Sequence, residues 1–126
     1  MTSTNINHTS IYKHTVKKMT ETKFCPIQKT LQLIGGKWKL VILFNLQNGS
    51  KRFGELKRDL SPITQQMLTK ELRDLEKNNF IHRKVFEIIP PKVEYSLSNH
   101  GKTLKPIFDS IQNFRDTNKK NLAQVE

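Results

Sequence analysis

The stretch from Arg52 to Lys77 constrains the fold more than any other part of the chain. It reads RFGELKRDL, SPI and TQQMLTKELRDLEK, so two amphipathic segments flank a corner at residues 61–63. At about 100° per residue, one side of the second segment is apolar. This side carries Leu68, Leu72 and Leu75. The opposite side carries polar groups at i, i+3, i+4 and i+7, namely Gln66, Thr69, Lys70 and Arg73.

This split surface predicts a helix-turn-helix whose recognition helix runs from Thr64 to Asn78. Amides, hydroxyls and cations are the groups that contact base edges and phosphates in DNA. Thr64 is the expected N-cap, with its hydroxyl near the backbone N–H of Met67. Taken alone, the stretch also fits an ordinary surface helix with a solvated polar face.

Composition favours a polyanionic partner. The 126 residues suit a single domain, and 22 Lys and Arg against 11 Asp and Glu give a net charge of +11. Such a surplus favours nucleic acid first and an acidic membrane surface second. The one cysteine excludes an intramolecular disulfide, and no apolar segment approaches the ~18 residues of a membrane span. We therefore expect a cytoplasmic protein without a membrane partner.

The segments before Arg52 predict an arm followed by two helices. Residues 1–24 are rich in Thr, Ser, Asn and Lys, which predicts a flexible N-terminal arm. Pro26 opens a first helix over residues 26–34, and Gly35-Gly36 ends it. The very apolar segment 37–48 predicts a central second helix. We expect one domain over residues 25–118 and a frayed tail over residues 119–126.

After Asn79 the hydrophobic period changes from 3.6 to 2. Residues 93–98, VEYSLS, alternate as a half-buried strand, and residues 81–88 are its expected partner. The turn between them, residues 89–92, contains two prolines that cannot continue a ladder. A hairpin directly after a helix-turn-helix is a wing.

A last helix is expected from near Asn99, with Pro106 bending it or marking its true start. Its long apolar stripe suits the seam of a homodimer. The stripe comprises Leu104, Ile107, Phe108, Ile111 and Phe114. The predicted fold is thus mainly α with a small β-hairpin, in the order α-α-α-α(recognition)-β-β(wing)-α.

Four long motifs in this order resemble the HxlR-type bacterial winged helix-turn-helix regulators, relatives of the MarR group. They are CPIQKTLQLIGGKWKLVILFNL, KRFGELKRDL, ITQQMLTKELRDLEKNNFIHRKVF and PPKVEYSLSNHGKTLKPI, across roughly residues 24–115. The resemblance implies a homodimer built through the first and last helices, which adds Ile27 and Leu31 to the seam. It also implies binding to a pseudo-palindromic operator and regulation of transcription.

The wing departs from the family pattern at one position. Where the family usually has Arg, in PPRVEY, this chain has Lys92. Lysine still meets a phosphate as a point charge but lacks the bidentate fork of arginine.

Nine residues are candidates for DNA binding. We assign Gln65, Gln66, Thr69 and Lys70 to base edges, because Gln can pair with adenine and Lys with guanine acceptors. The expected phosphate contacts come from the third helix, from the recognition helix and from the wing. They are Arg52, Thr64, Arg73, Lys84 and Lys92. For each cation the alternative is a solvated surface charge.

Cys25 is the candidate sensor. The resemblance implies it, because some members use a cysteine directly before the proline that opens the first helix. A helix N-terminus together with Lys23 and Lys29 favours the thiolate. A lone cysteine can act through an electrophile adduct, a mixed disulfide with a small thiol, or a bridge to Cys25 of a second copy. The alternative is a packed residue without chemistry.

Other site chemistries find little support. His8, His14, His82 and His100 are far apart in sequence and, with one cysteine, make a poor metal set. We see no catalytic constellation and expect neither a metal, nor another cofactor, nor an enzyme. The leading hypothesis is a homodimeric regulator that binds double-stranded DNA. The alternative is a winged-helix interaction module that docks protein or RNA.

Overall fold

The computed structural model describes residues 25–123 of the chain, which fall into two compact units. The boundary lies at Gly36, so residues 25–36 belong to the first unit and residues 37–123 to the second. The predicted arm, residues 1–24, and the end of the predicted tail, residues 124–126, lie outside the described residues. The predicted domain over residues 25–118 spans this boundary. Between residues 25 and 123, no helix has both the length and the apolar character needed to cross a bilayer.

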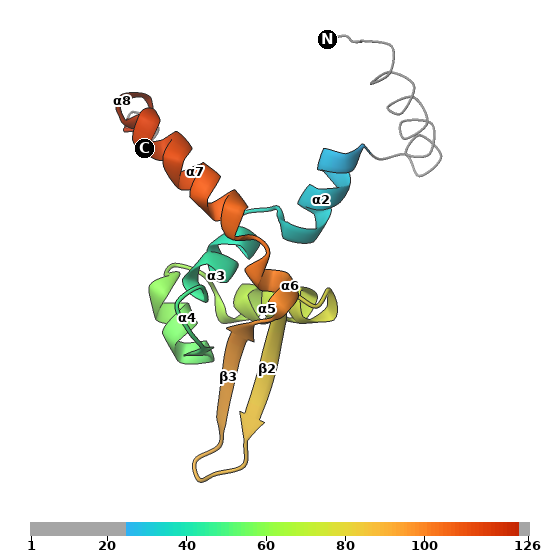
Figure 1. Cartoon of the computed structure of the whole chain (residues 1–126). Coiled ribbons are helices and arrows are strands. Elements are labelled where there is room, and N and C mark those ends of the chain that lie inside the picture. The colour runs from blue at the N-terminus through green and yellow to red at the C-terminus, as the bar shows by residue number, and fades with distance from the viewer. Residues whose placement is uncertain (1–24, 124–126) are drawn as a thin grey trace. The chain divides into compact units, whose positions relative to one another are not determined.

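The first unit contributes helix α2, Pro26–Ile34, over the predicted range (Figure 1). Cys25 is its N-cap, and its Sγ accepts a hydrogen bond from the backbone N–H of Gln28 at 3.4 Å. The side chain of Gln28 accepts in return from the backbone N–H of Cys25 at 3.1 Å. After the helix, Gly36 has a φ of +85°, a conformation that favours glycine.

The second unit begins with three helices around one aliphatic core. They are α3, Lys39–Asn45; α4, Phe53–Asp59; and α5, Gln65–Lys77. Helix α3 contacts both α4 and α5. The side chains at the centre of this core include Ile42, Leu43, Leu56, Leu68, Leu72 and Leu75. The predicted leucine stripe of the recognition helix is therefore confirmed as the buried face of α5.

The corner between α4 and α5 is anchored in the same core. Leu60 and Ile63, on either side of the Ser61-Pro62 pair, are both buried. The backbone N–H of Ile63 donates to the carbonyl of Leu60 at 3.0 Å, which closes the turn. Burial on both sides of the corner fixes how α5 leaves α4, as in a helix-turn-helix.

The wing consists of β2, Ile81–Phe86, and β3, Lys92–Leu97, paired antiparallel from Ile81 opposite Leu97 to Phe86 opposite Lys92. A third strand, β1 (Lys51–Arg52), pairs with the other edge of β3 and gives the strand order β1-β3-β2. The sequence did not predict β1, because two residues are too few to show a period. In Figure 1 the hairpin projects away from the helices of this unit. The arrangement is a winged helix-turn-helix, as predicted.

The last predicted helix is divided. Helix α6, Asn99–Lys102, is followed by α7, Lys105–Thr117, and by α8, Lys119–Leu122. Pro106 lies in the first turn of α7 and thus marks a helix start instead of a bend. Helix α8 lies within the range of the predicted frayed tail, residues 119–126, and is separated from α7 by Asn118.

Two residues of the predicted dimer seam belong to the core of this chain. Leu104 and Phe108 are only 7% and 3% exposed. The ring of Phe108 meets that of Phe44 edge to face, with centroids 5.7 Å apart. Assigning these two residues to the seam was wrong, because a helical stripe contains both inward and outward positions. The outer positions, Ile107, Ile111 and Phe114, remain exposed.

Candidate nucleic-acid interface

Thr64 fixes the start of α5. Its Oγ1 accepts a hydrogen bond from the backbone N–H of Met67 at 3.1 Å, which confirms the predicted N-cap. A hydroxyl that accepts in this way keeps its own proton as a donor. Capping the helix is therefore compatible with a contact from Thr64 to a phosphate.

The exposed face of α5 is hollowed along its length. A surface hollow of about 560 Å³ is lined by polar side chains from successive turns of the helix. The buried leucines of α5 lie on the opposite face, so the backbone that carries these groups is held by the core. The lining residues are Gln65, Gln66, Thr69, Lys70, Arg73 and Asp74. The structure thus brings together all five α5 candidates.

Asp74 is the member of this group that sequence reasoning missed. Its Oδ2 lies 3.5 Å from Nζ of Lys70, and the i, i+4 spacing of the two residues was a signal that could have revealed the pair. Thr69 is also engaged, because its Oγ1 donates to the carbonyl of Gln65 at 2.8 Å. The two glutamines are both exposed.

An ion pair behind this face joins α5 to α3. Nζ of Lys39 lies 2.5 Å from Oε1 of Glu71 and 3.5 Å from Oδ2 of Asp74, and the side chains of Lys39 and Glu71 are 12% and 11% exposed. Burial alone lowers the pKa of Lys39. The hydrogen bond and charge of Glu71, with Asp74, outweigh it and raise this pKa above 10.5. The polar face of α5 is therefore fixed to α3 by charge as well as by leucine packing.

Where α5 meets the wing, charged groups surround a tyrosine. Nε of Arg83 on β2 lies 3.5 Å from Oε1 of Glu76 on α5. Burial is the main cause that raises the pKa of Tyr95 on β3, and Glu76 adds to it, while Arg83 and Arg73 oppose it. Arg73, a residue of α5, thus lies close enough to the wing to act on Tyr95.

The two predicted wing cations flank one aromatic ring. Nζ of Lys92 and Nζ of Lys84 lie 4.3 and 4.8 Å from the centre of the Phe86 ring, within cation–π range. Lys92 is the first residue of β3 and not part of the turn, and its ammonium also lies 3.2 Å from Oε2 of Glu94. Lys92 is therefore a tethered cation whose side chain is 22% exposed.

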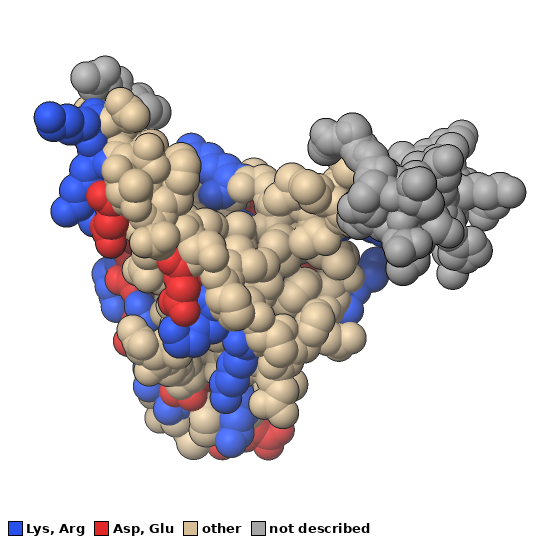
Figure 2. Space-filling view, turned by 45° about the horizontal axis from the view of Figure 1, so that its top comes forward, with Lys and Arg blue, Asp and Glu red and all other residues tan. Residues whose placement is uncertain are grey.

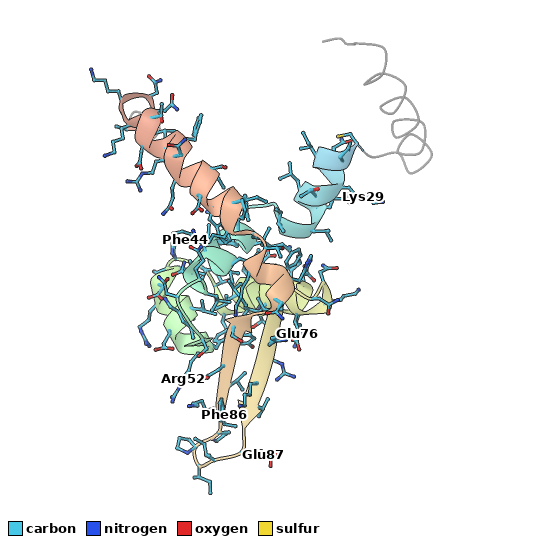
Figure 3. The ribbon with its side chains drawn as sticks, viewed as in Figure 1. Lys29, Phe44, Arg52, Glu76, Phe86 and Glu87 are labelled. Atoms are coloured by element: carbon cyan, nitrogen blue, oxygen red, sulfur yellow. The ribbon has the colours of Figure 1, made fainter. Side chains whose placement is uncertain are left out.

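Arg52 lies next to the hairpin (Figure 3). It is the N-cap of α4, and its backbone N–H donates to Oε1 of Glu55 at 2.8 Å. A phosphate that approached this helix N-terminus would therefore compete with a carboxylate for that N–H. A hollow of about 590 Å³ opens beside Arg52. It is lined by Ser50, Arg52, Gly54, Glu55, Arg58 and Glu94.

Sequence reasoning did not single out Arg58 or Glu94. The register between β1 and β3, which places Arg52 opposite Glu94, cannot be read from a two-residue strand. In the view of Figure 2, Lys and Arg side chains are interspersed with Asp and Glu over the surface.

The candidate sensor lies in the first unit. Cys25 is an exposed free thiol at the N-cap of α2. On the same helix, Ile27 and Leu31 of the predicted seam are 70% and 51% exposed. Among residues 25–123, we find no group of three or more His, Cys, Asp or Glu side chains that could hold a metal ion.

Known proteins match most of this chain. Residues 33–123 match the model of the HxlR-like helix-turn-helix family. The HTH-type transcriptional regulator YdeP of Bacillus subtilis (strain 168) is 44% identical over 102 residues, which cover 81% of this chain and 80% of that protein.

Two solved structures agree with the fold. The redox regulator HypR in its oxidized form superposes with a TM-score of 0.71 at 46% identity, covering 75% of this chain and 97% of HypR. The HTH-type transcriptional regulator ytcD gives a TM-score of 0.74 at 45% identity, covering 77% of this chain and 99% of ytcD. Together with the buried leucine stripe, the polar face of α5 and the wing, these matches show that this chain is a transcriptional regulator of the HxlR-like helix-turn-helix family.

Proposed function

We propose that this regulator binds double-stranded DNA sequence-specifically, as a homodimer on a pseudo-palindromic operator. The observation that carries the proposal is the polar face of α5, where five candidate side chains line one hollow while the leucines opposite them are buried. A helix held in this way presents its side chains to the major groove without losing core packing.

The proposed roles follow from position along the interface. Gln65 and Gln66, in the first turn of α5, and Thr69 and Lys70, in the second, read base edges. Arg73 is further along the helix and holds a phosphate. Contacts to the phosphate backbone fix register but carry no sequence information directly. Besides Arg73, they come from Arg52, Thr64, Lys84 and Lys92.

The homodimer is supported by exposed apolar side chains at helical spacing. Ile107, Ile111 and Phe114 on α7 are 36%, 50% and 60% exposed. A two-fold dimer would place its two recognition helices about 34 Å apart, one turn of DNA. On α2, the exposed Ile27 and Leu31 supply further apolar surface.

The test compares Gln66→Ala with Arg52→Ala on the operator, selected beforehand from random duplexes, and on a scrambled duplex. Because it loses a base contact, Gln66→Ala should bind the operator more weakly by about 1–3 kcal/mol of binding free energy. Its binding to the scrambled duplex should change little. Arg52→Ala should weaken both complexes and flatten the salt slope by about 1. Equal losses on both duplexes would rule out base reading by Gln66. Binding of protein or RNA without duplex DNA would favour an interaction module instead.

We also propose that Cys25 makes the regulator responsive to oxidants or electrophiles. The thiol is exposed, and it accepts the hydrogen bond of a helix N-cap. The structural relative HypR is named a redox regulator. An adduct with an electrophile, a mixed disulfide with a small thiol, or a disulfide to Cys25 of the other subunit would each change this cap.

The sensing proposal is tested by treating the DNA complex with diamide or a quinone. The unmodified protein should release its operator, whereas Cys25→Ser should stay bound, since serine retains a capping oxygen but lacks the thiol. Mass spectrometry under non-reducing conditions distinguishes an adduct from an inter-subunit bridge. Release of DNA by treated Cys25→Ser would refute sensing through this residue.

A further inference from the structure

A carboxylate lies in the middle of a row of cations at the base of the wing. Glu94 on the central strand β3 is opposite Arg52 of β1 on one side and opposite Lys84 of β2 on the other. Residues directly opposite each other across strands project to the same face of a sheet. Glu94 therefore shares its face with two of the proposed phosphate contacts.

Both oxygens of this carboxylate have partners. Oε2 lies 3.2 Å from Nζ of Lys92, and Oε1 accepts a hydrogen bond from Oγ of Ser50 at 3.2 Å. The hydrogen bond from Lys92 is the main cause that lowers the pKa of Glu94, and Ser50 and Arg52 act in the same direction. Glu94 is therefore a charged acceptor at neutral pH, among donors that a DNA phosphate would also use.

We propose that Glu94 limits the affinity of the regulator for any DNA backbone by occupying the donors of Lys92 and Ser50, and by offsetting the charge of Arg52, in the absence of DNA. This inference rests on the proposed DNA binding. A phosphate that approaches the hollow beside Arg52 must displace the hydrogen bonds to Glu94 or bind next to its negative charge. Either way, the cost is the same for operator and random sequence, because no base takes part.

The other charged residues that line the hollow beside Arg52 do not have the role proposed for Glu94. Arg58 and Glu55, one cation and one anion, complete its charged lining. Glu55 already accepts from the backbone N–H of Arg52 and so acts on the cap of α4. Glu94 is the carboxylate that is bonded to a cation of the wing, and this makes it the residue whose neutralisation frees phosphate donors.

The experiment measures Glu94→Gln, which keeps the size of the side chain and removes its charge. We expect roughly threefold to tenfold tighter binding, by the same factor on operator and scrambled DNA. The slope of log affinity against log salt should steepen by about 1. In the background of Arg52→Ala the gain should shrink, because one of the charges that Glu94 offsets is then missing. Equal thermal unfolding curves establish that the variant is folded.

Asp109→Asn is the matched control. It changes the net charge by the same amount on α7, which Figure 1 shows on the other side of the helices from the wing, and Asp109 is also ion-paired, with Lys105 at 2.9 Å. Its affinity for DNA should stay within about twofold of the unmodified chain, since long-range charge effects are screened by salt.

The outcomes separate this inference from the function on which it rests. No binding of duplex DNA by the unmodified chain would overturn the proposed function and the inference together. Binding by the unmodified chain with no gain, or a loss, in Glu94→Gln would overturn the inference alone. An equal gain in Asp109→Asn would reduce the effect to net charge and would also overturn it.

Discussion

Gly101 shows how closely α6 packs on the rest of the second unit. A Cβ at this buried position would collide with the carbonyl group of Phe80 and approach Cδ2 of Leu97 to 3.2 Å. The same carbonyl accepts a hydrogen bond from the backbone N–H of Ser98 at 3.0 Å, and Oγ of Ser98 accepts from the N–H of Gly101 at 2.9 Å. A side chain at residue 101 would therefore push apart groups that are hydrogen-bonded to one another.

We predict that Gly101→Ala lowers the free energy of unfolding by about 1–3 kcal/mol, as overpacking does elsewhere. Denaturant unfolding measures the change. Gly54→Ala is the control, because a Cβ there would meet only Nη1 of Arg58 at 3.7 Å, an ordinary contact. Alanine also suits the helix better, so Gly54→Ala should be neutral or stabilising by up to about 1 kcal/mol. Equal losses in both variants would contradict this account.

Single residues of the site were predictable where local spacing decides their place. The helical period was enough to put Gln66, Thr69 and Lys70 on one face, and the cap chemistry of Thr64 needs only the next three residues. Lys92 was named as a candidate, but Glu94 and the contacts of both residues were not predictable in this way. Their partners come from strand register and side-chain packing, which are tertiary properties.

At the scale of elements, the contact between α3 and α5 includes the ion pair Lys39–Glu71. Both side chains are nearly buried, so loss of one partner leaves an uncompensated charge. We predict that Lys39→Met costs about 3 kcal/mol of unfolding free energy, and that Lys39→Met with Glu71→Leu restores most of it. Chemical denaturation of the two variants checks this, and a double variant as unstable as the single one would refute it.

The same pair predicts a dependence on alkaline pH. Because the pKa of Lys39 is raised above 10.5 in the folded chain, its contribution is fully present below pH 10.5. This contribution is lost as the pH rises through the folded-state pKa. The free energy of unfolding should therefore fall more steeply above pH 10.5 in the unmodified chain than in the double variant. Parallel curves in the two proteins would exclude the effect.

Elements were predicted well where they are long and periodic. Helices α2 and α5 were found within a residue of their ends, since caps and apolar stripes mark both. Strand β1 was not predicted, because it is defined only by the pairing of Lys51 and Arg52 with Tyr95 and Glu94 of β3 in the folded chain. The division between α6 and α7 was signalled by Pro106, which lies in the first turn of α7. The inward position of the buried Leu104 could not be read from the stripe.

For the whole molecule, the proposed homodimer can be tested with one substitution at two places. Ile111→Glu puts a charge into the exposed stripe of α7 and should dissociate the dimer, because a charge buried in an apolar interface is costly. Ile89→Glu makes the same change at a residue that is 99% exposed in the wing turn and should leave the dimer intact. Sedimentation equilibrium measures the mass of both. Dissociation by neither variant would place the dimer contact elsewhere.

The short length of β1 has a consequence for motion along the wing. Strand β1 covers β3 only at Tyr95 and Glu94, so toward the turn the hairpin is an exposed ribbon of two strands, whereas Ile81 and Leu97 at its other end are buried. An isolated pair of strands opens more readily than a sheet of three. Amide protons near Phe86 and Lys92 should therefore exchange with solvent faster than those near Ile81 and Leu97. The outer half of the wing can bend to follow a DNA groove, while the half that carries Glu94 stays paired with β1 at the start of α4.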